Sequence, residues 1–178
     1  IYREGWVDWS KTSGNIKNKV KPLFDKVDLV VSQGFIGSTN ENNTTTLGRE
    51  GSDYSAAIFS HGLGFESMTI WTDVPGVLTA DPRKFRNVTK LDNLSYKEAI
   101  EMTYYGAKVI HPKTIKPLQN KIIPLHVKSF VSPTESGTLV SNEVIVGYPP
   151  IITIESEQAL INISTRDFSF VAEHHLSY

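Results

Sequence analysis

The stretch TTTLGREGSDYSAAIF, residues 44–59, decides the fold that we expect for this chain. Gly48 and Gly51 bracket a turn, and a run with the spacing of an amphipathic helix follows it. The positions that share one face of this run are Tyr54, Ala57, Ile58 and His61. Ser52 can cap the helix and Asp53 suits its positive first turn, so we predict a helix that begins at residue 52.

The turn before this helix has two interpretations. A glycine-bracketed turn at a helix N-terminus exposes free backbone N–H groups, which favour a phosphate or carboxylate ligand. Arg49 stands beside it, and the guanidinium fork suits a carboxylate. The alternative is a helix-entry loop with solvated charges, and this stretch alone gives the two equal weight.

Short apolar runs on both sides of this helix predict buried strands. They are residues 29–31, 67–71 and 122–130. Helical patterns alternate with them, at residues 13–26, 91–106 and 112–121. Pro22 interrupts the first pattern, Ser95 and Glu98 form a capping box in the second, and His111 is interpreted as the cap of the third rather than a metal ligand. This alternation predicts a mostly parallel α/β sheet.

Polar residues follow the predicted strands, at the sheet edge where open α/β folds bind ligands. Thr72 and Asp73 come after the strand at 67–71. Asp73 could accept hydrogen bonds from a ribose or an adenine edge, although for this residue alone a turn cap is the favoured interpretation. Arg83 could reach a phosphate or be solvated, and Lys108 could point at a phosphate, although for Lys108 alone a solvated side chain is the favoured interpretation.

Composition limits the class of protein. The chain has 178 residues, of which 39% are hydrophobic, enough to bury one substantial core. Its formal net charge is -1 and its Lys and Arg residues form no block, so we expect neither a nucleic-acid nor a membrane partner. It has no cysteine, which excludes disulfides and thiolate metal sites and fits a cytoplasmic protein. No apolar run approaches the roughly 20 residues of a membrane span.

A boundary falls near Tyr148, where two prolines follow. We assign residues 1–142 to one domain and 143–178 to a linker and the beginning of a second. Strand-like patterns at 143–147, 151–155 and 159–164 and a helical pattern at 168–176 make up this second part. Because the chain starts without methionine and stops in mid-pattern, we expect it to be a segment of a longer protein.

Five stretches in this order resemble the aspartate kinases of the amino-acid kinase family. They are QGFIG at 33–37, TTTLGREGSDYSAA at 44–57, WTDVPGV with ADPR at 71–83, YGAKVIHP at 105–112, and SGT at 136–138. The resemblance covers roughly residues 30–140. It implies the amino-acid kinase fold, here the nucleotide-binding lobe with its mostly parallel sheet between helices, followed by an incomplete α+β domain of the ACT regulatory type.

The resemblance also implies roles for residues at matching positions. The residues on the aspartate side are Phe35, Arg49, Glu50, Gly51 and Ser52. Asp53 and Lys108 would act close to the reacting groups. The nucleotide contacts are Thr72, Asp73, Leu78, Arg83, Lys108 and Val109. The family more often has glycine at the position of Glu50 and tyrosine at that of Leu78, and these two assignments depart from its pattern.

The activity implied is transfer of the γ-phosphoryl group of ATP to the side-chain carboxylate of L-aspartate, the first step of lysine, threonine and methionine biosynthesis. Mg²⁺ would be held mainly by the ATP phosphates, with Asp53 in contact through water. The resemblance also implies a lysine or threonine effector and a homodimer or higher oligomer built through ACT domains. The family's lysine-bearing KxGG loop has no counterpart here, so we expect the isolated chain to be inactive.

Two other functions stay open. One is another amino-acid kinase, acting on glutamate, acetylglutamate or a nucleotide. The other is a non-catalytic module for regulation or dimerisation. The GREGSDY context and the ACT-like strands argue against the first, and the sequence upstream of residue 1 would decide the second.

Overall fold

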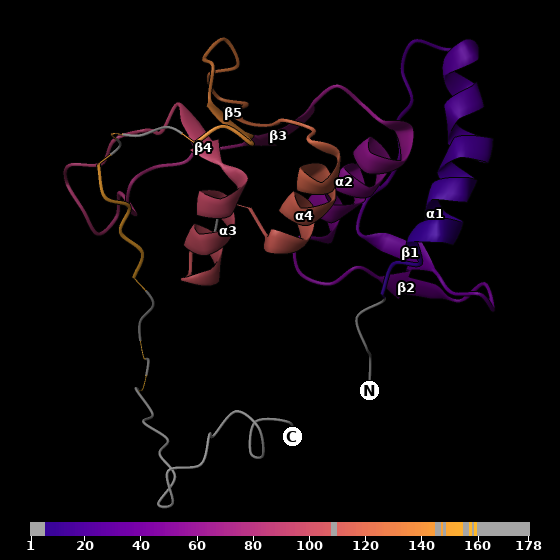
Figure 1. Ribbon diagram of the computed structural model, residues 1–178, viewed down its shortest axis with the longest axis horizontal. Coiled ribbons are helices and arrows are strands. Elements are labelled where there is room, and N and C mark those ends of the chain that lie inside the picture. The colour runs from indigo at the N-terminus through magenta and orange to yellow at the C-terminus, as the bar shows by residue number, and fades with distance from the viewer. Residues whose placement is uncertain are drawn as a thin grey trace, which may run out of the picture.

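The computed structural model describes residues 6–107, 110–144, 147, 149–154, 157 and 159. Its elements are, in chain order, α1 (Trp9–Asn15), the π-helix η1 (Ile16–Val20), the 3-10 helix η2 (Lys21–Asp25), β1 (Ile36–Ser38), β2 (Thr44–Thr46), α2 (Gly51–Leu63), β3 (Met68–Thr72), β4 (Asn93–Ser95), α3 (Tyr96–Tyr104), α4 (Pro112–Lys121), β5 (Leu125–Ser129) and β6 (Thr138–Ser141). Figure 1 shows their arrangement.

The main sheet has four strands in the order β3-β5-β6-β4. β3 runs parallel to β5, and β4 runs parallel to β6, whereas β5 and β6 are antiparallel. The mostly parallel α/β sheet predicted from the sequence is therefore confirmed. β1 and β2 form a separate antiparallel pair that lies near α1 and α2 (Figure 1).

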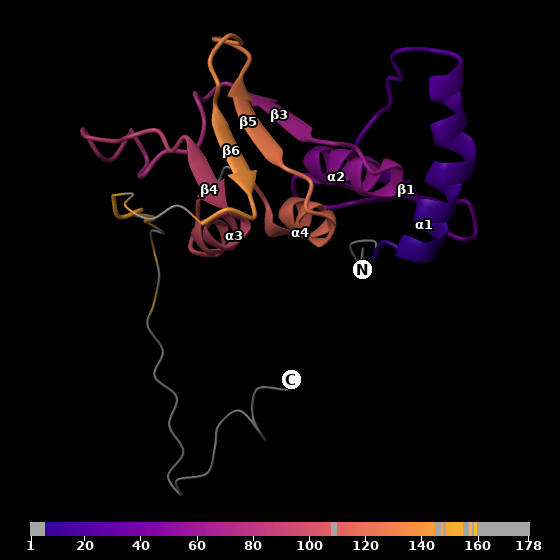
Figure 2. The same cartoon turned by 45° about the horizontal axis from the view of Figure 1, so that its top comes forward.

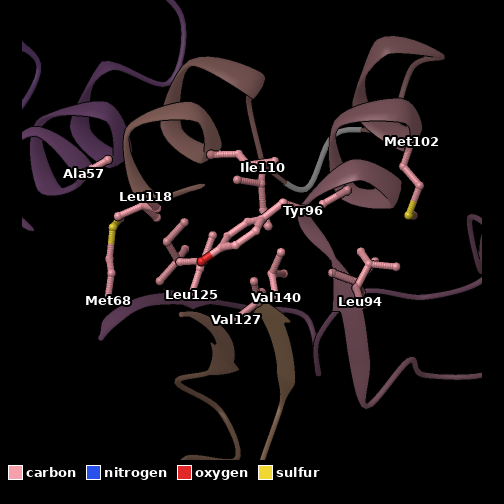
Figure 3. Close-up of a cluster of buried hydrophobic side chains, with 14 of the residues drawn as sticks. Ala57, Met68, Leu94, Tyr96, Met102, Ile110, Leu118, Leu125, Val127 and Val140 are labelled. Atoms are coloured by element: carbon pink, nitrogen blue, oxygen red, sulfur yellow. The ribbon is translucent and has the colours of Figure 1, made fainter. Parts of the chain in front are cut away.

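Helices cover one face of the main sheet. α3 and α4 lie side by side below it, and α2 packs against α4 (Figure 2). Buried aliphatic side chains from the sheet and these helices form the core, including the fully buried Leu125, Val127 and Val140 (Figure 3). Tyr96 is also buried there, and its hydroxyl donates to the carbonyl oxygen of Ile123 at 2.6 Å. A core hydrogen bond thus links the start of α3 to the chain entering β5.

The predicted helix starts at α3 and α4 are confirmed by their caps. Ser95 Oγ accepts from the N–H of Glu98 at 3.2 Å, and Glu98 Oε2 accepts from the N–H of Ser95 at 2.9 Å, which completes the capping box. Nδ1 of His111 accepts from the N–H of Lys113 at 3.1 Å. The pattern assigned to one helix over 91–106 nevertheless contains β4 before α3, because residues 93–95 pair with β6.

Two predictions near the N-terminus need correction. The helical run begins at Trp9 rather than residue 13, since Asp8 caps it by accepting from the N–H of Lys11 at 3.0 Å. It changes to a 3-10 helix at Lys21–Asp25, where Pro22 removes a backbone donor. Residues 29–31 form no strand, and Val31 is 86% exposed. An apolar run forms a strand only where a neighbour pairs with its backbone, and no described strand does so here.

Most of residues 143–178 lie outside the described part of the chain, so the structure tests few of the predictions made for them. Glu143, Val144 and residues 151–154 form no strand, contrary to the pattern. The remaining predictions for this part, including the helix at 168–176, lie outside the described residues. Ile152 lies after the predicted boundary, yet its N–H donates to the carbonyl oxygen of Thr79 at 2.8 Å. In the part of the chain that the structure covers, no helix has the length and apolar character to cross a bilayer.

Candidate functional site

The site begins at the N-terminus of α2, one residue earlier than expected. Gly51 is the first helical residue, and Glu50 holds the capping position with φ 54° and ψ 33°. Ser52 therefore lies in the first turn and is not the cap, and the side chain of Glu50 makes no capping hydrogen bond. The glycine-bracketed turn before the helix is confirmed, because the N–H of Gly51 donates to the carbonyl oxygen of Gly48 at 3.1 Å.

Phe35 is held against this first turn. Its N–H donates to Ser55 Oγ at 2.9 Å, and its carbonyl oxygen accepts from the N–H of Leu47 at 2.8 Å. A Cβ on Gly51 would lie only 2.7 Å from Phe35 Cδ2, so glycine is what lets the ring approach the helix. The structure thus gathers the five residues predicted for the aspartate side at one end of α2.

The charges at this end of α2 are unevenly compensated. Burial, and then the negative charge of Glu50, raise the pKa of the Asp53 carboxyl. Glu50 Oε1 lies 4.0 Å from Arg49 Nε, whereas Glu50 Oε2 is buried without a hydrogen-bond partner. The side chain of Arg49 is 66% exposed, which leaves its guanidinium accessible to an anion.

Arg49 and Glu50 line a pocket of about 360 Å³. Its other lining residues come from the end of α3 and the start of α4: Thr103, Tyr104, Gly106, Ala107, His111 and Pro112. Thr103 Oγ1 contacts the carbonyl oxygens of Ala99 at 2.8 Å and of Ile110 at 2.6 Å, which ties α3 to the segment entering α4. Sequence reasoning missed Thr103 and Tyr104, which carry no motif of their own.

A larger pocket of about 920 Å³ contains Thr72, Asp73, Leu78 and Arg83 in its lining. The four described residues predicted to contact a nucleotide are therefore brought together. Gly106 and Ala107 line both pockets, so the two hollows adjoin there. The other two predicted nucleotide contacts, Lys108 and Val109, follow directly and lie outside the described residues.

The larger pocket has further lining residues that sequence reasoning missed. Lys84 and Phe85 follow Arg83, Met102 comes from α3, and residues 152–154 come from the segment after the predicted domain boundary. Lys84 adds a second cation beside Arg83, and the only signal for it in the sequence is adjacency to the ADPR stretch. Residues 152–154 had been assigned to the second domain, so no pattern connected them to this pocket.

Arg83 is exposed, and among the described residues Asp81 restrains it. Asp81 Oδ1 accepts from the N–H of Arg83 at 2.9 Å and from its Nε at 3.2 Å. The backbone hydrogen bond is the main cause of the lowered pKa of the Asp81 carboxyl. An exposed ion pair of this kind is weak, so the guanidinium is free to turn to a phosphate. Within the described ranges, no group of three or more His, Cys, Asp or Glu side chains could hold a metal ion.

Comparison with known proteins shows which family this chain resembles. The model of the amino acid kinase family matches residues 8–129. Lysine-sensitive aspartokinase 3 of Escherichia coli K12 is 39% identical over 163 residues, 84% of this chain and 36% of that protein. The chloroplastic bifunctional aspartokinase/homoserine dehydrogenase 1 of Arabidopsis thaliana is 45% identical over 116 residues, 65% of this chain and 13% of that protein.

Solved structures give the same result. E. coli aspartokinase III in complex with aspartate and ADP superposes with a TM-score of 0.77 and 40% identity, over 82% of this chain and 32% of that one. The complex of the same enzyme with lysine and aspartate gives a TM-score of 0.69 and 42% identity, over 78% of this chain and 31% of that chain. The chain thus spans about a third of the length of the E. coli enzyme.

Proposed function

This chain belongs to the amino acid kinase family, and on that premise we propose that it is part of an aspartate kinase and carries the enzyme's nucleotide-binding lobe. One observation supports this most directly: two pockets adjoin at Gly106 and Ala107, one beside Arg49 and the other beside Asp73. A phosphoryl transfer needs two ligands side by side, and this arrangement provides for both.

The larger pocket is the proposed ATP site. Its volume of about 920 Å³ is ample for a nucleotide. Thr72 and Asp73, at the end of β3, offer a hydroxyl and a carboxylate to the ribose or the base. Arg83 would offset phosphate charge, and Lys108 is proposed to do so as well. Leu78 and Val109 would supply apolar contact.

The smaller pocket is the proposed aspartate site. Arg49 offers its guanidinium to a substrate carboxylate, and the N-terminus of α2 adds the positive end of its dipole beside it. Phe35 does not line the pocket, but its ring lies against Gly51 at the same end of α2 and would be available to the aspartate side. Glu50 brings a negative charge to a site for an acidic substrate, and its backbone rather than its carboxylate is the useful part.

The proposed reaction forms one bond and breaks one. A side-chain carboxylate oxygen of aspartate attacks the γ-phosphorus of ATP, and the bond from that phosphorus to the oxygen bridging it to the β-phosphorus breaks. The products are 4-phospho-L-aspartate and ADP, which keeps the electron pair of the broken bond. No protein nucleophile is needed, and catalysis rests on positioning and on neutralising charge. Lys108 and the dipole of α2 would stabilise the transferring group, with Asp53 nearby.

A magnesium ion would neutralise phosphate charge in this reaction. The described carboxylates do not form a cage for it, and we propose that the phosphates of ATP are its main ligands. Asp53 is the proposed protein contact, through water. The desolvation that raises the pKa of Asp53 would be relieved by a cation in this position.

For the whole protein we propose an ACT-type regulatory domain that follows this lobe, inhibition by lysine or threonine, and assembly into a homodimer or higher oligomer. The E. coli relative is named lysine-sensitive, which supports an amino-acid effector. A cytoplasmic location is part of the same proposal, supported by the lack of cysteine in the sequence.

The test uses the product of the complete gene, assayed for ADP formation with aspartate, glutamate, N-acetylglutamate or UMP as acceptor. We expect turnover with aspartate. Arg49→Ala should raise the aspartate KM about 30-fold, equivalent to roughly 2 kcal/mol, and leave the ATP KM unchanged. Asp73→Ala should do the reverse. Lys97→Ala, on an exposed face of α3, is the matched control and should change neither.

Three results would contradict the proposal. Preference for another acceptor would make the protein a different amino-acid kinase. The absence of turnover with every acceptor would favour a non-catalytic module. An unchanged aspartate KM in Arg49→Ala would remove Arg49 from the site.

A further inference from the structure

One wall of the larger pocket is a hairpin formed by residues 77–91. The N–H of Leu91 donates to the carbonyl oxygen of Val77 at 2.9 Å, and the N–H of Thr79 donates to that of Thr89 at 2.9 Å. Leu78 and Lys90 form an antiparallel bridge between these two pairs. The loop of the hairpin, residues 80–85, belongs to the pocket lining. The position of the wall therefore depends on what holds the base of this hairpin.

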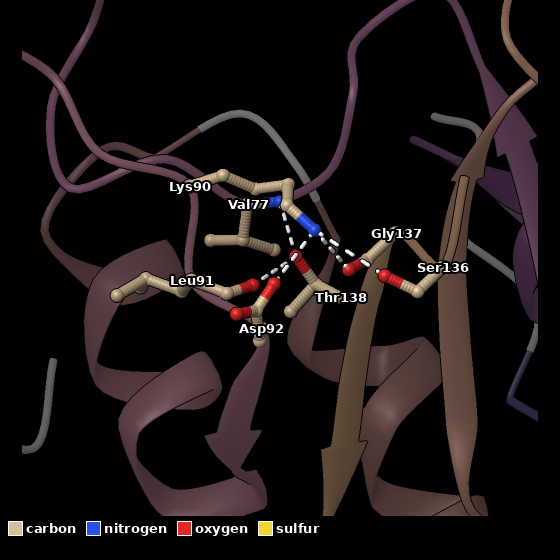
Figure 4. A network of polar contacts seen from close by, with 7 residues as sticks. All are labelled: Val77, Lys90, Leu91, Asp92, Ser136, Gly137 and Thr138. Atoms are coloured by element: carbon tan, nitrogen blue, oxygen red, sulfur yellow. Dashed lines mark hydrogen bonds and ion pairs between the residues drawn. The ribbon is translucent and has the colours of Figure 1, made fainter.

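Thr138 holds both arms at this base. Its Oγ1 accepts from the N–H of Val77 at 2.8 Å and donates to the carbonyl oxygen of Leu91 at 2.5 Å (Figure 4). Thr138 is fully buried and is the first residue of β6, where it pairs with Val127 of β5. One hydroxyl thus fixes the hairpin to the middle of the main sheet.

The surroundings leave this hydroxyl little room to move. A Cβ on Gly76 would lie 2.5 Å from Thr138 Oγ1, so the turn before Val77 rests directly on the threonine. Gly137 has φ 72°, and a Cβ there would lie 2.1 Å from the carbonyl oxygen of Val127. Lys90 Nζ closes the cluster through Gly137 O at 2.9 Å and Asp92 Oδ1 at 2.7 Å (Figure 4).

We propose that Thr138 is a positioning residue for nucleotide binding: its hydroxyl sets the hairpin of residues 77–91 at the distance from β3 that the nucleotide requires. The proposal rests on the function proposed above. Thr138 does not line the pocket, whereas Leu78 and Arg83 on the hairpin and Asp73 after β3 do. Loss of the hydroxyl would leave Val77 N–H and Leu91 O without this partner and free the hairpin to shift relative to Asp73.

The test compares three variants of the complete gene product. Thr138→Val replaces the hydroxyl by a methyl group of similar size, and Thr138→Ser keeps the hydroxyl. Tyr96→Phe is the matched control, because it also removes one buried hydroxyl, at 2.6 Å from Ile123 O, without touching the hairpin. Each variant is assayed for the KM of ATP, the KM of aspartate and the thermal unfolding midpoint.

We expect Thr138→Val to raise the ATP KM about tenfold with the aspartate KM unchanged, and Thr138→Ser to stay within about twofold of the parent. Tyr96→Phe should lower the unfolding midpoint and leave the ATP KM as it was. An unchanged ATP KM in Thr138→Val overturns the proposal. An equal rise of the ATP KM in Tyr96→Phe also overturns it. Either result would mean that Thr138 contributes to stability alone and does not position the hairpin.

If Thr138→Val does not fold, Thr138→Ala takes its place, because it also removes the hydroxyl, at a residue that does not line the pocket. A raised ATP KM then supports the proposal and an unchanged one overturns it. A parent protein that does not use ATP would instead refute the proposed function, so the two failures are distinguishable.

Discussion

Replacing Glu50 by glycine should make this protein more stable and improve its use of aspartate. Glu50 has left-handed backbone angles, φ 54° and ψ 33°, which cost a residue with a Cβ roughly 1–2 kcal/mol. Glycine avoids this cost, but it gives the unfolded chain more conformational freedom, which lowers the free energy of unfolding by about 0.4–1 kcal/mol. The ion pair with Arg49, at 4.0 Å and with Arg49 mostly exposed, contributes little. We therefore expect a net gain of about 1 kcal/mol.

Two control variants separate the effect of the left-handed backbone conformation at position 50 from the effect of the negative charge of Glu50. Glu50→Ala removes the carboxylate but keeps a Cβ in the left-handed region, so Glu50→Gly should exceed it in unfolding free energy by about 1 kcal/mol. Glu50→Gln keeps the strain and removes only the charge. Urea unfolding followed by circular dichroism at pH 7 measures all three. If Glu50→Ala is as stable as Glu50→Gly, the backbone argument is wrong.

The charge itself predicts a dependence on pH. Burial and Glu50 raise the pKa of Asp53 in the folded state, so ionised Asp53 reduces stability, and this penalty disappears as the pH falls through the raised pKa. The stabilisation by Glu50→Gln should accordingly be largest near pH 7 and shrink in acid. The aspartate KM should fall in both Glu50→Gln and Glu50→Gly, because a negative charge leaves the proposed site of an acidic substrate.

Three further predictions concern other parts of the molecule. Burial, and then the charge of Lys121, lower the pKa of His61. The stability that depends on its neutral form should therefore be lost as the pH falls below about 6.5. Urea unfolding from pH 7 to 5 measures this loss, and in His61→Gln the free energy of unfolding should depend less on pH. Gly51→Ala should displace Phe35, whose Cδ2 would lie 2.7 Å from the new Cβ, and raise the aspartate KM but not the ATP KM, as steady-state kinetics would show. The 178-residue chain alone should release no ADP in an aspartate-dependent way, since it lacks a KxGG loop; measurable release would refute this.

Local signals in the sequence were sufficient where an element depends on its own residues. The capping box of Ser95 and Glu98, the cap at His111 and the change of helix type near Pro22 all follow from side chains within a few positions. Four of the residues that line the larger pocket, Thr72, Asp73, Leu78 and Arg83, could also be predicted from strand ends and motif order, although their roles stay predictions.

Pairing between distant segments could not be predicted. The composition of residues 29–31 predicts a strand. A segment becomes a strand only when a neighbouring strand pairs with its backbone, and no described strand pairs with residues 29–31. Conversely, β4 and β6 are short and polar at several positions, and they become strands because they pair with each other. The conformation of Glu50 was hidden for another reason: glutamate is rarely found with a positive φ, so only the comparison with glycine in the family pointed to it.

The order of the strands has a consequence for how this protein is made. β3 leaves the ribosome well before β5, its only partner in the described sheet, because α3 and α4 lie between them in the chain. Its apolar residues Met68 and Ile70, which are core residues in the folded protein, therefore stay exposed until the rest of the domain has been synthesised. Contacts that join distant segments slow folding and prolong the exposure of unpaired edges. During synthesis, β3 is accordingly the segment at which chaperone binding or premature aggregation should begin.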